Sequence, residues 1–370
     1  MINDLAVYFA ENGHKVHIFT SDYKRKIYSD EFNKNITIYC LKAFKFRQSN
    51  KIIRFFQELI FPYLIIYHYR KELNKLNTKL AIYYSPPIFW KPVMKYLKKN
   101  NDTFNYLVLR DLFPKWLVDL NIIKDNSPIN LILKIFENNL YEISDAIGIQ
   151  SPKNSIFFKD SYNHYLNKVE LLYNWINPLN LHSNEAFVLD QKKINIVYVG
   201  NIGVAQNINF LKSLTKYISS KHHINLSFFS SGSLLNDLKN FVNFYNFKNI
   251  FFYKTIPNEN LIYQISMADL GIVSLISEFR THNIPGKFLS YLNAGIPVAC
   301  ALNANNDLFE IVSKYRVGFC EHSDQFTSFT IKLDEFLKKN NQKDIKKNCA
   351  KLINELFSTK TAYLKILSHV

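Results

Sequence analysis

The sequence predicts an α/β protein with two domains, each built on a doubly wound parallel sheet. Two observations support this. Short apolar runs typical of buried strands alternate with amphipathic helical segments in both halves of the chain, and one polar, irregular stretch interrupts that alternation. A chain of 370 residues is long enough for two ordinary domains. We expect a first domain over 1–176, a linker over 177–192, a second domain over 193–357, and a C-terminal helix over 358–370 that packs back on the first domain.

The composition limits the partners and the chemistry. A formal charge of +16 favours polyanionic partners: nucleic acid, an anionic membrane face or phosphorylated substrates. The basic residues are dispersed and no nucleic-acid recognition motif appears, so we expect no nucleic acid. Cys40, Cys300, Cys320 and Cys349 lie far apart, without zinc or redox spacing, which predicts buried free thiols.

The first half opens with a helix rather than a strand. Residues 3–12 carry apolar side chains on one helical face and end at Asn12-Gly13. A doubly wound domain normally opens with a strand and a glycine-rich turn. We therefore expect that the first strand is missing from this sequence, or that the domain is built without it. The strands expected in this half are 16–20, 36–40, 80–84, 106–109, 146–150 and 169–173, with a helix over 131–141.

The stretch 42–75 is both basic and aromatic. A basic amphipathic helix with aromatic side chains is typical of an interfacial membrane contact. The alternative is a core helix with a solvated charged rim. We favour the membrane contact because cations and aromatics are interleaved on one segment. The longest apolar run, near 61–69, is interrupted by Pro62 and His68 and is too short to span a bilayer.

Arg110 and Asp111 follow the expected strand 106–109. Open α/β sheets bind ligands at the carboxyl ends of their strands, so both residues are candidates for acceptor contact or catalysis. A simple salt bridge or a helix N-cap explains the pair equally well.

The second half holds seven of the nine glycines, and a phosphate that approaches the backbone closely needs glycine there. We therefore expect the phosphate-binding residues in this half. Strand 194–199 ends in Gly200-Asn201-Ile202-Gly203, and strand 224–229 ends near Gly232. The other elements expected are strands 249–253, 269–273 and 317–320, and helices 206–219, 258–266 and 309–315.

The stretch 282–298 predicts a loop, a short helix and a buried strand. Pro285 suits the first helical turn, and Gly295 the left-handed residue that ends a helix. Lys287 is unusual, because a cation in the first turn opposes the helix dipole. A bound anion would remove that conflict, and Gly286 would let it approach the backbone. The alternative is a solvated lysine at a helix start.

These motifs together resemble the GT-B glycosyltransferases, and among them the retaining glycosyltransferases of family 4. The resemblance covers nearly the whole chain: 3–16 is similar to the family's first helix and second strand, 200–206 to its first donor-domain loop, and 285–298 to its diphosphate-binding signature. The most similar branch is the transferases that extend O-antigen or capsule repeats, including fucosamine transferases. The resemblance implies two Rossmann-like domains facing a cleft.

The resemblance also implies roles for individual residues. Lys287 would neutralise the leaving diphosphate, and the backbone near Gly203 would contact the same phosphates. Family members often carry two glutamates eight positions apart in this motif, where this sequence has His282 and Ser290; the second glutamate would hold the donor ribose. His282 is a donor to sugar or phosphate, or a loop histidine without a role. The implied catalytic residues are Lys287, Asp111 and His282, and the implied donor-binding residues are Gly200, Asn201, Gly203, Gln206, Gly232, Pro285, Gly286, Lys287, Ser290 and Glu310.

The expected activity is transfer of a sugar, with retention, from a nucleoside-diphosphate sugar to a lipid-linked oligosaccharide of a surface polysaccharide. UDP is the expected donor nucleotide. We expect a cytoplasmic protein, peripheral on the inner face of the membrane and drawn to its anionic surface. The nucleotide-sugar is a co-substrate, and we expect no metal and no cofactor. Two alternatives remain: an inactive or scaffolding paralogue, and a GT-B nucleotide-sugar epimerase, which needs further acid/base carboxylates near the sugar.

Overall fold

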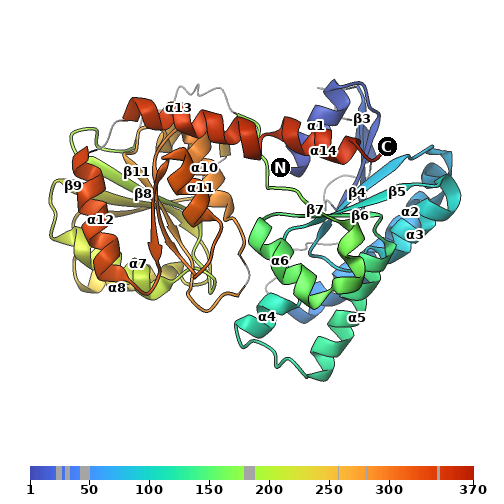
Figure 1. Cartoon of the computed structure of the whole chain (residues 1–370), viewed down its shortest axis with the longest axis horizontal. Helices are drawn as coiled ribbons and strands as arrows, with labels where there is room; N and C mark the ends of the chain where they lie inside the picture. The colour runs from blue at the N-terminus through green and yellow to red at the C-terminus, as the bar shows by residue number, and fades with distance from the viewer. Residues whose placement is uncertain are drawn as a thin grey trace. The chain divides into compact units, whose positions relative to one another are not determined.

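The computed structural model of the chain describes residues 1–21, 27–29, 34–41, 51–178, 188–256, 258–280, 282–339 and 342–370. It divides into two compact units (Figure 1). Unit 1 comprises Met1–Tyr173 and Thr359–Val370, and unit 2 comprises Asn174–Ser358. Residues 42–50 of the proposed membrane segment and 179–187 of the expected linker lie outside the described residues.

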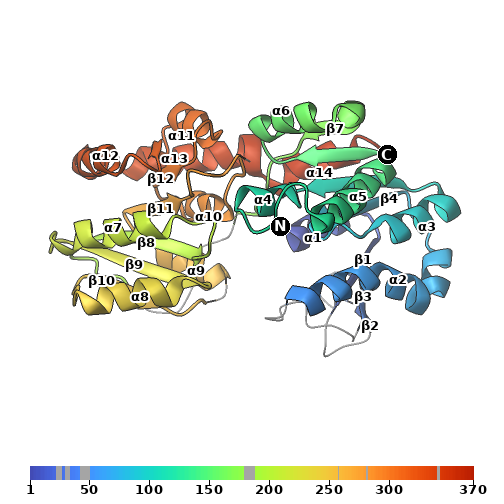
Figure 2. The same cartoon turned by 90° about the horizontal axis from the view of Figure 1, so that it is seen from below.

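Unit 2 is built on one parallel sheet of six strands in the order β10-β9-β8-β11-β12-β13 (Figure 2). Chain order reverses between β8 and β11, and this switch point is where a doubly wound sheet binds its ligand, at the carboxyl ends of the strands. The bounds are β8 (Ile194–Asn201), β9 (Ile224–Ser231), β10 (Ile250–Tyr253), β11 (Leu270–Ser274), β12 (Val298–Leu302) and β13 (Gly318–His322).

The strands of unit 2 are apolar along nearly their whole length, as expected for a parallel sheet covered on both faces. Phe210, Leu211 and Leu214 of one covering helix pack on Ile196 and Leu226 of the sheet. The helices of this unit are α7 (Ile208–Ser219), α8 (Leu235–Phe244), α9 (Asn258–Ile265), α10 (Gly286–Ala294), α11 (Leu308–Tyr315), α12 (Phe326–Lys339) and α13 (Gln342–Leu352), followed by a π-helical turn, Ile353–Phe357.

Unit 1 has its described strands in two sheets. One sheet has the order β1-β3-β2, and the other has the order β4-β5-β6-β7. All pairs are parallel except the pair of β2 and β3, which is antiparallel, and the sequence analysis did not predict β2. The bounds are β1 (Val16–Ser21), β2 (Ile27–Ser29), β3 (Ile36–Leu41), β4 (Leu80–Ser85), β5 (Phe104–Leu109), β6 (Ala146–Ile149) and β7 (Val169–Leu171).

The C-terminal helix of the chain packs on its first helix, within unit 1 (Figure 1). The ring of Tyr363 lies 4.7 Å from that of Phe9, and its hydroxyl is 3.0 Å from His14 Nε2. The helices of unit 1 are α1 (Ile2–Glu11), α2 (Lys51–Lys75), α3 (Lys91–Asn101), α4 (Lys115–Asp119), α5 (Pro128–Ile143), α6 (Pro152–Ser161) and α14 (Thr359–Leu367).

Candidate functional site: the carboxyl edge of the unit 2 sheet

Helix α10 carries the central candidate, Lys287, in its first turn. Pro285, expected in the first helical turn, instead precedes the helix with an extended backbone, whereas Gly295 ends it in the left-handed conformation at φ 72°, as the sequence predicts. Phe288, Leu289 and Leu292, the apolar residues at helical spacing, are each buried. These contacts fix the face that α10 turns to the sheet, so that Lys287 is held in a defined place.

Tyr291 anchors α10 over the switch point. Its hydroxyl accepts a hydrogen bond from the backbone N–H of Val199 at 3.0 Å and donates one to the carbonyl of Ile272 at 2.9 Å. Those two groups belong to β8 and β11, the strands that diverge here. A Cβ at Gly271 would lie 2.4 Å from the Tyr291 ring, so glycine is required at that position. Because Lys287 and Tyr291 are four residues apart, they share one face of the helix.

The amine of Lys287 lies against Tyr198 of β8. Its Nζ is 3.7 Å from the centre of the ring and donates a hydrogen bond to the hydroxyl, which in turn donates to the carbonyl of Asn201 at 3.3 Å. Burial lowers the pKa of Lys287 to about 7. A bound anion would favour the charged form and raise this pKa again. An anion placed beside this amine would therefore be accompanied by uptake of a proton.

The loop that follows β8 packs against the loop that follows β9, and Gly232 allows their backbones to approach closely. Gly232 has φ 127°, and a Cβ there would lie 2.4 Å from the carbonyl oxygen of Ile202. The N–H of Ile202 donates to the carbonyl of Ser231 at 2.7 Å. The N–H of Gly203 donates to Gln206 Oε1 at 3.0 Å. A phosphate oxygen in place of that side chain would receive the same N–H, as in other glycine-rich loops.

Three further predicted residues lie on this edge. Ser290 donates from its hydroxyl to the carbonyl of Gly286 at 3.4 Å, within its own helix. Glu310 is exposed on the first turn of α11, which follows β12. His282 is half-buried on the loop before α10. That loop is tied to the end of β12 by two side-chain hydrogen bonds: Asn303 Nδ2 donates to the carbonyl of Phe279 at 2.9 Å, and Asn306 Nδ2 to that of Asn283 at 3.5 Å.

Asp111 lies in the other unit. It follows β5 of unit 1, where the N–H groups of Arg110 and Asp111 donate to the carbonyl of Ser85 at 3.2 and 3.4 Å. The structure therefore brings the predicted donor-binding residues, Lys287 and His282 to one edge of unit 2, and places Asp111 at a strand end of unit 1.

Two residues of the site were missed by the sequence analysis: Tyr198 and Tyr291. Both are fully buried and use their hydroxyls to hold the first turn of α10. A signal was present, since Tyr198 comes two residues before the glycine loop and Tyr291 comes four after Lys287. A tyrosine in an apolar run, however, has the same pattern as an ordinary core residue.

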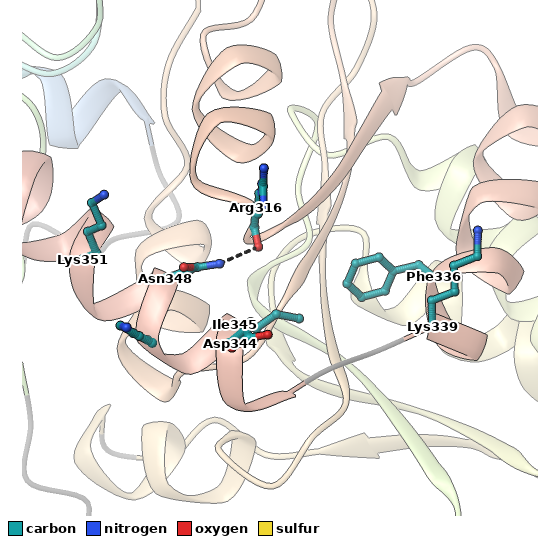
Figure 3. A pocket seen from close by; sticks show the side chains of 8 residues that line it. Arg316, Phe336, Lys339, Asp344, Ile345, Asn348 and Lys351 are labelled. Atoms are coloured by element: carbon teal, nitrogen blue, oxygen red, sulfur yellow. Dashed lines mark hydrogen bonds between the residues drawn. The ribbon is translucent and has the colours of Figure 1, made fainter.

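A cavity of about 540 Å³ lies elsewhere in unit 2, between α12 and α13 (Figure 3). In it, Asn348 Nδ2 donates to the carbonyl of Arg316 at 3.4 Å. Its lining includes four cations and one carboxylate and is separate from the predicted donor site. The lining residues are Arg316, Phe336, Lys339, Asp344, Ile345, Lys347, Asn348 and Lys351.

Within the described ranges, the His, Cys, Asp and Glu side chains form no group of three or more that could hold a metal ion. The expectation that neither metal nor cofactor takes part stays a prediction.

Comparison with known proteins identifies solved structures of similar fold. No protein-family model and no curated protein matches the sequence. Among solved structures, a sucrose-phosphate synthase from Thermosynechococcus elongatus superposes with a TM-score of 0.73 at 13% identity, over 100% of this chain and 91% of that one. WaaG, a glycosyltransferase involved in lipopolysaccharide biosynthesis, gives 0.66 at 12% identity, over 99% and 94%.

TarM of S. aureus, in a complex that contains UDP, gives a TM-score of 0.59 at 12% identity, over 83% of this chain and 58% of that one. These identities establish similarity of fold alone. The α/β prediction of two Rossmann-like domains is confirmed, and the structural neighbours of this chain are GT-B glycosyltransferases.

Proposed function

We propose that this chain is a glycosyltransferase that moves a sugar, with retention, from UDP-sugar to a lipid-linked oligosaccharide acceptor in surface polysaccharide synthesis. One observation carries the proposal. The amine of the half-buried Lys287 lies against the Tyr198 ring at the switch point of a GT-B donor-type sheet, between a glycine loop and the open backbone at Gly286. That arrangement matches the charge of a nucleoside diphosphate.

The chemistry follows from where charge develops. When the bond from the anomeric carbon to the diphosphate breaks, both electrons stay on the leaving phosphate oxygen. Lys287, charged by the approach of the diphosphate, and the N–H groups at the start of α10 would stabilise that oxygen. The half-buried position of the amine strengthens the interaction relative to a fully solvated lysine, because less water competes with it. His282 and Asp111 remain proposed catalytic residues on the donor and acceptor sides.

UDP is proposed as the nucleotide on the basis of the neighbours. Two glycosyltransferase structures that share the fold, those of TarM and of the pneumococcal O-GlcNAc transferase GtfA, are complexes that contain UDP. The glycine loop 200–206 and Ser290 would surround the nucleoside and its phosphates in this chain. Ser290 lacks the carboxylate that would bind the ribose, so we expect modest affinity for the nucleotide.

A lipid-linked acceptor is proposed from helix α2, which is apolar on two faces. Phe61, Ile65 and Tyr69 pack in the core of unit 1. The opposite face exposes a stripe at helical spacing, in which Tyr67 is 80% exposed. A stripe of this kind next to Arg70 and Lys71 suits the surface of an anionic membrane. The stripe consists of Ile53, Phe56, Ile60, Tyr63 and Tyr67.

Helix α5 adds a second exposed apolar surface that the sequence analysis did not predict. Its members are Ile129, Leu131, Ile132 and Ile135. The two helices are joined through Phe89, whose ring lies 5.5 Å from Phe55 of α2 and 4.9 Å from Phe136 of α5. Among the described helices, none has the length and apolar character needed to cross a bilayer. We propose that both surfaces rest on the inner face of the cell membrane.

The test is a transfer assay. The full chain is incubated with a panel of UDP-sugars and a lipid-diphosphate-linked sugar in anionic vesicles. The proposal expects a lengthened lipid-linked product and free UDP, with the anomeric configuration of the donor retained. Epimerised UDP-sugar without acceptor would establish the epimerase instead, and UDP binding without turnover of any donor would establish a binding or scaffolding protein.

A further inference from the structure

The cavity between α12 and α13 lies at the opposite edge of the unit 2 sheet from Lys287. Arg316, which lines it, directly follows α11 and comes shortly before β13 begins at Gly318. The sheet is parallel, so the start of β13 belongs to its amino edge. Lys287 lies in the first turn of α10 at the carboxyl edge, and α10 runs back to the amino edge at Gly295. The cavity is therefore distinct from the predicted donor site.

Three elements form the walls of the cavity (Figure 3). Phe336 and Lys339 come from α12 on one side, and Asn348 and Lys351 come from α13 on the other, with Arg316 between them. The hydrogen bond from Asn348 to the carbonyl of Arg316 joins α13 to the end of α11. The volume of about 540 Å³ is in the range of sites that bind small organic molecules.

Two apolar side chains line the cavity, and both are held in place by packing. Ile345 of α13 is 7% exposed. The ring of Phe336 lies 5.6 Å from that of Phe319 on β13, and packs against the core cluster of the sheet. Because their positions are fixed, these two side chains give the cavity a defined apolar surface. An apolar or aromatic group of a ligand would be removed from water there.

The charged side chains of the lining are mostly cations. In the described part of the chain, Arg316, Lys339 and Lys347 take part in no ion pair. Their like charges repel one another across the cavity. A bound anion would replace that repulsion with attraction and accept hydrogen bonds from the same groups. The charged lining consists of Arg316, Lys339, Lys347, Lys351 and Asp344.

The positions of the helix ends explain only some of these cations. Arg316 directly follows α11 and Lys339 ends α12, where a cation is favourable beside the last carbonyl groups. Lys351 lies in the last turn of α13 and is 3.9 Å from Glu355. Lys347 lies inside α13, four residues before Lys351, and like charges at this spacing destabilise a helix. A ligand anion accounts for Lys347 as well as for the others.

We propose that this cavity binds a small organic phosphate, a molecule with a phosphate group and an apolar or aromatic body. The body would lie against Phe336 and Ile345. The phosphate would lie among Arg316, Lys339 and Lys347. A phosphate monoester carries nearly two negative charges at neutral pH, which matches an excess of cations better than the single charge of a carboxylate. This inference rests on unit 2 alone and is independent of the proposed function.

The test uses phenyl phosphate, which joins an aromatic ring to a phosphate monoester. Its binding to the full chain is measured by calorimetric titration at neutral pH and low ionic strength, beside inorganic phosphate and phenol, the two halves of the probe. Lys339→Glu and Lys347→Glu reverse one charge on each of two walls. Lys338→Glu is the matched control, because Lys338 is exposed and adjacent to Lys339 on α12 but does not line the cavity.

The proposal predicts equal affinity of phenyl phosphate for the wild type and Lys338→Glu. It predicts affinity at least about tenfold weaker in Lys339→Glu and in Lys347→Glu. Binding that neither of these two charge reversals weakens would overturn the proposal. Both lysines are exposed, so we expect the variants to fold, and hydrogen exchange of the β8 amides checks this.

Two further comparisons do not depend on the charge reversals. In the wild type, phenyl phosphate should bind at least about tenfold more tightly than inorganic phosphate or phenol, because each half supplies only one of the two contacts. Equal affinity of the probe and either half would contradict the combined apolar and cationic site. Lys287→Ala should bind phenyl phosphate as the wild type does. Loss of binding in Lys287→Ala would assign the probe to the donor site and overturn the proposal.

Discussion

Units 1 and 2 share one architecture but differ in the continuity of their sheets. Unit 2 has six strands in one parallel sheet, and α10 lies over the point where β8 and β11 diverge. Unit 1 has seven described strands in two sheets, β1-β3-β2 and β4-β5-β6-β7. In unit 2, Tyr291 fills the divergence and positions Lys287. In unit 1, the described strands β1 and β4 belong to different sheets.

This difference shows one way in which backbone groups at a switch point are satisfied. Where β8 and β11 diverge, the hydroxyl of Tyr291 bonds a backbone group of each strand, so neither group is left unpaired in the core. The predictions below test the contrast between the two units, from the largest expected effect to the smallest.

The largest effect is expected in unit 2. Lys287→Ala removes the cation at the leaving diphosphate and should lower turnover by about 10²–10³-fold, or about 3–4 kcal/mol. The measurement is the transfer assay at saturating donor. Lys216→Ala, which removes an exposed lysine of α7 in the same unit, is the matched control and should keep full activity. Equal activity of the two variants would contradict the role of Lys287.

The two units should respond to pH in opposite directions. In unit 1, Glu137 is buried and accepts hydrogen bonds from the hydroxyls of Tyr141 at 2.8 Å and Tyr162 at 2.6 Å. Burial raises its pKa to about 7, against these hydrogen bonds. The folded state then holds a proton that the unfolded state releases, so Glu137 stabilises unit 1 less as pH rises from about 4.5 to 7. In unit 2 the pKa of Lys287 is lowered, so stability falls as pH decreases from 10.5 toward about 7.

In the wild type, the free energy of unfolding of unit 1 should fall by about 3 kcal/mol between pH 4.5 and 7, and Glu137→Gln should not show this fall. Hydrogen exchange in β5 and β6, compared with β8 and β9, assigns the change to its unit. Glu335→Gln, at an exposed carboxylate of unit 2, is the control. An unchanged pH dependence in Glu137→Gln would show that Glu137 is already ionised in the folded protein.

Tyr291→Phe keeps the ring but leaves the buried N–H of Val199 without its acceptor. The expected cost is about 1–3 kcal/mol in the free energy of unfolding of unit 2. Exchange should rise first at β8 and β11, the strands that the hydroxyl joins. If the loss were spread evenly over both units, the anchoring role of the hydroxyl would be wrong.

The smallest effect concerns the membrane. Tyr67→Glu places a charge in the exposed stripe of α2 and should weaken binding to anionic vesicles by about tenfold, or about 1–2 kcal/mol. Phe244→Glu is the matched control, because Phe244 of α8 in unit 2 is also 80% exposed. Vesicle binding is measured by sedimentation. If Tyr67→Glu and Phe244→Glu weakened it equally, the assignment of the membrane contact to unit 1 would be wrong.

Much of unit 2 could be predicted from the sequence. Its strands are apolar runs bounded by glycine and polar residues, so most of their positions agree with the prediction within two residues. Lys287 was identifiable because a cation is unexpected in a first helical turn. Tyr198 and Tyr291 were not, since their roles depend on hydroxyl hydrogen bonds between segments far apart in the chain. The expectation of an unusual start to the first domain did not reveal that its sheet divides in two, because strand pairing is non-local.

The most direct test of the central claim is proton uptake on nucleotide binding. Calorimetric titration with UDP near pH 8, in two buffers of different ionisation enthalpy, gives the number of protons taken up. Lys287, neutral against Tyr198 without ligand and charged beside the diphosphate, predicts an uptake of nearly one proton in the wild type and almost none in Lys287→Ala. Equal uptake by the two proteins, or UDP binding that Lys287→Ala leaves unchanged, would contradict the account.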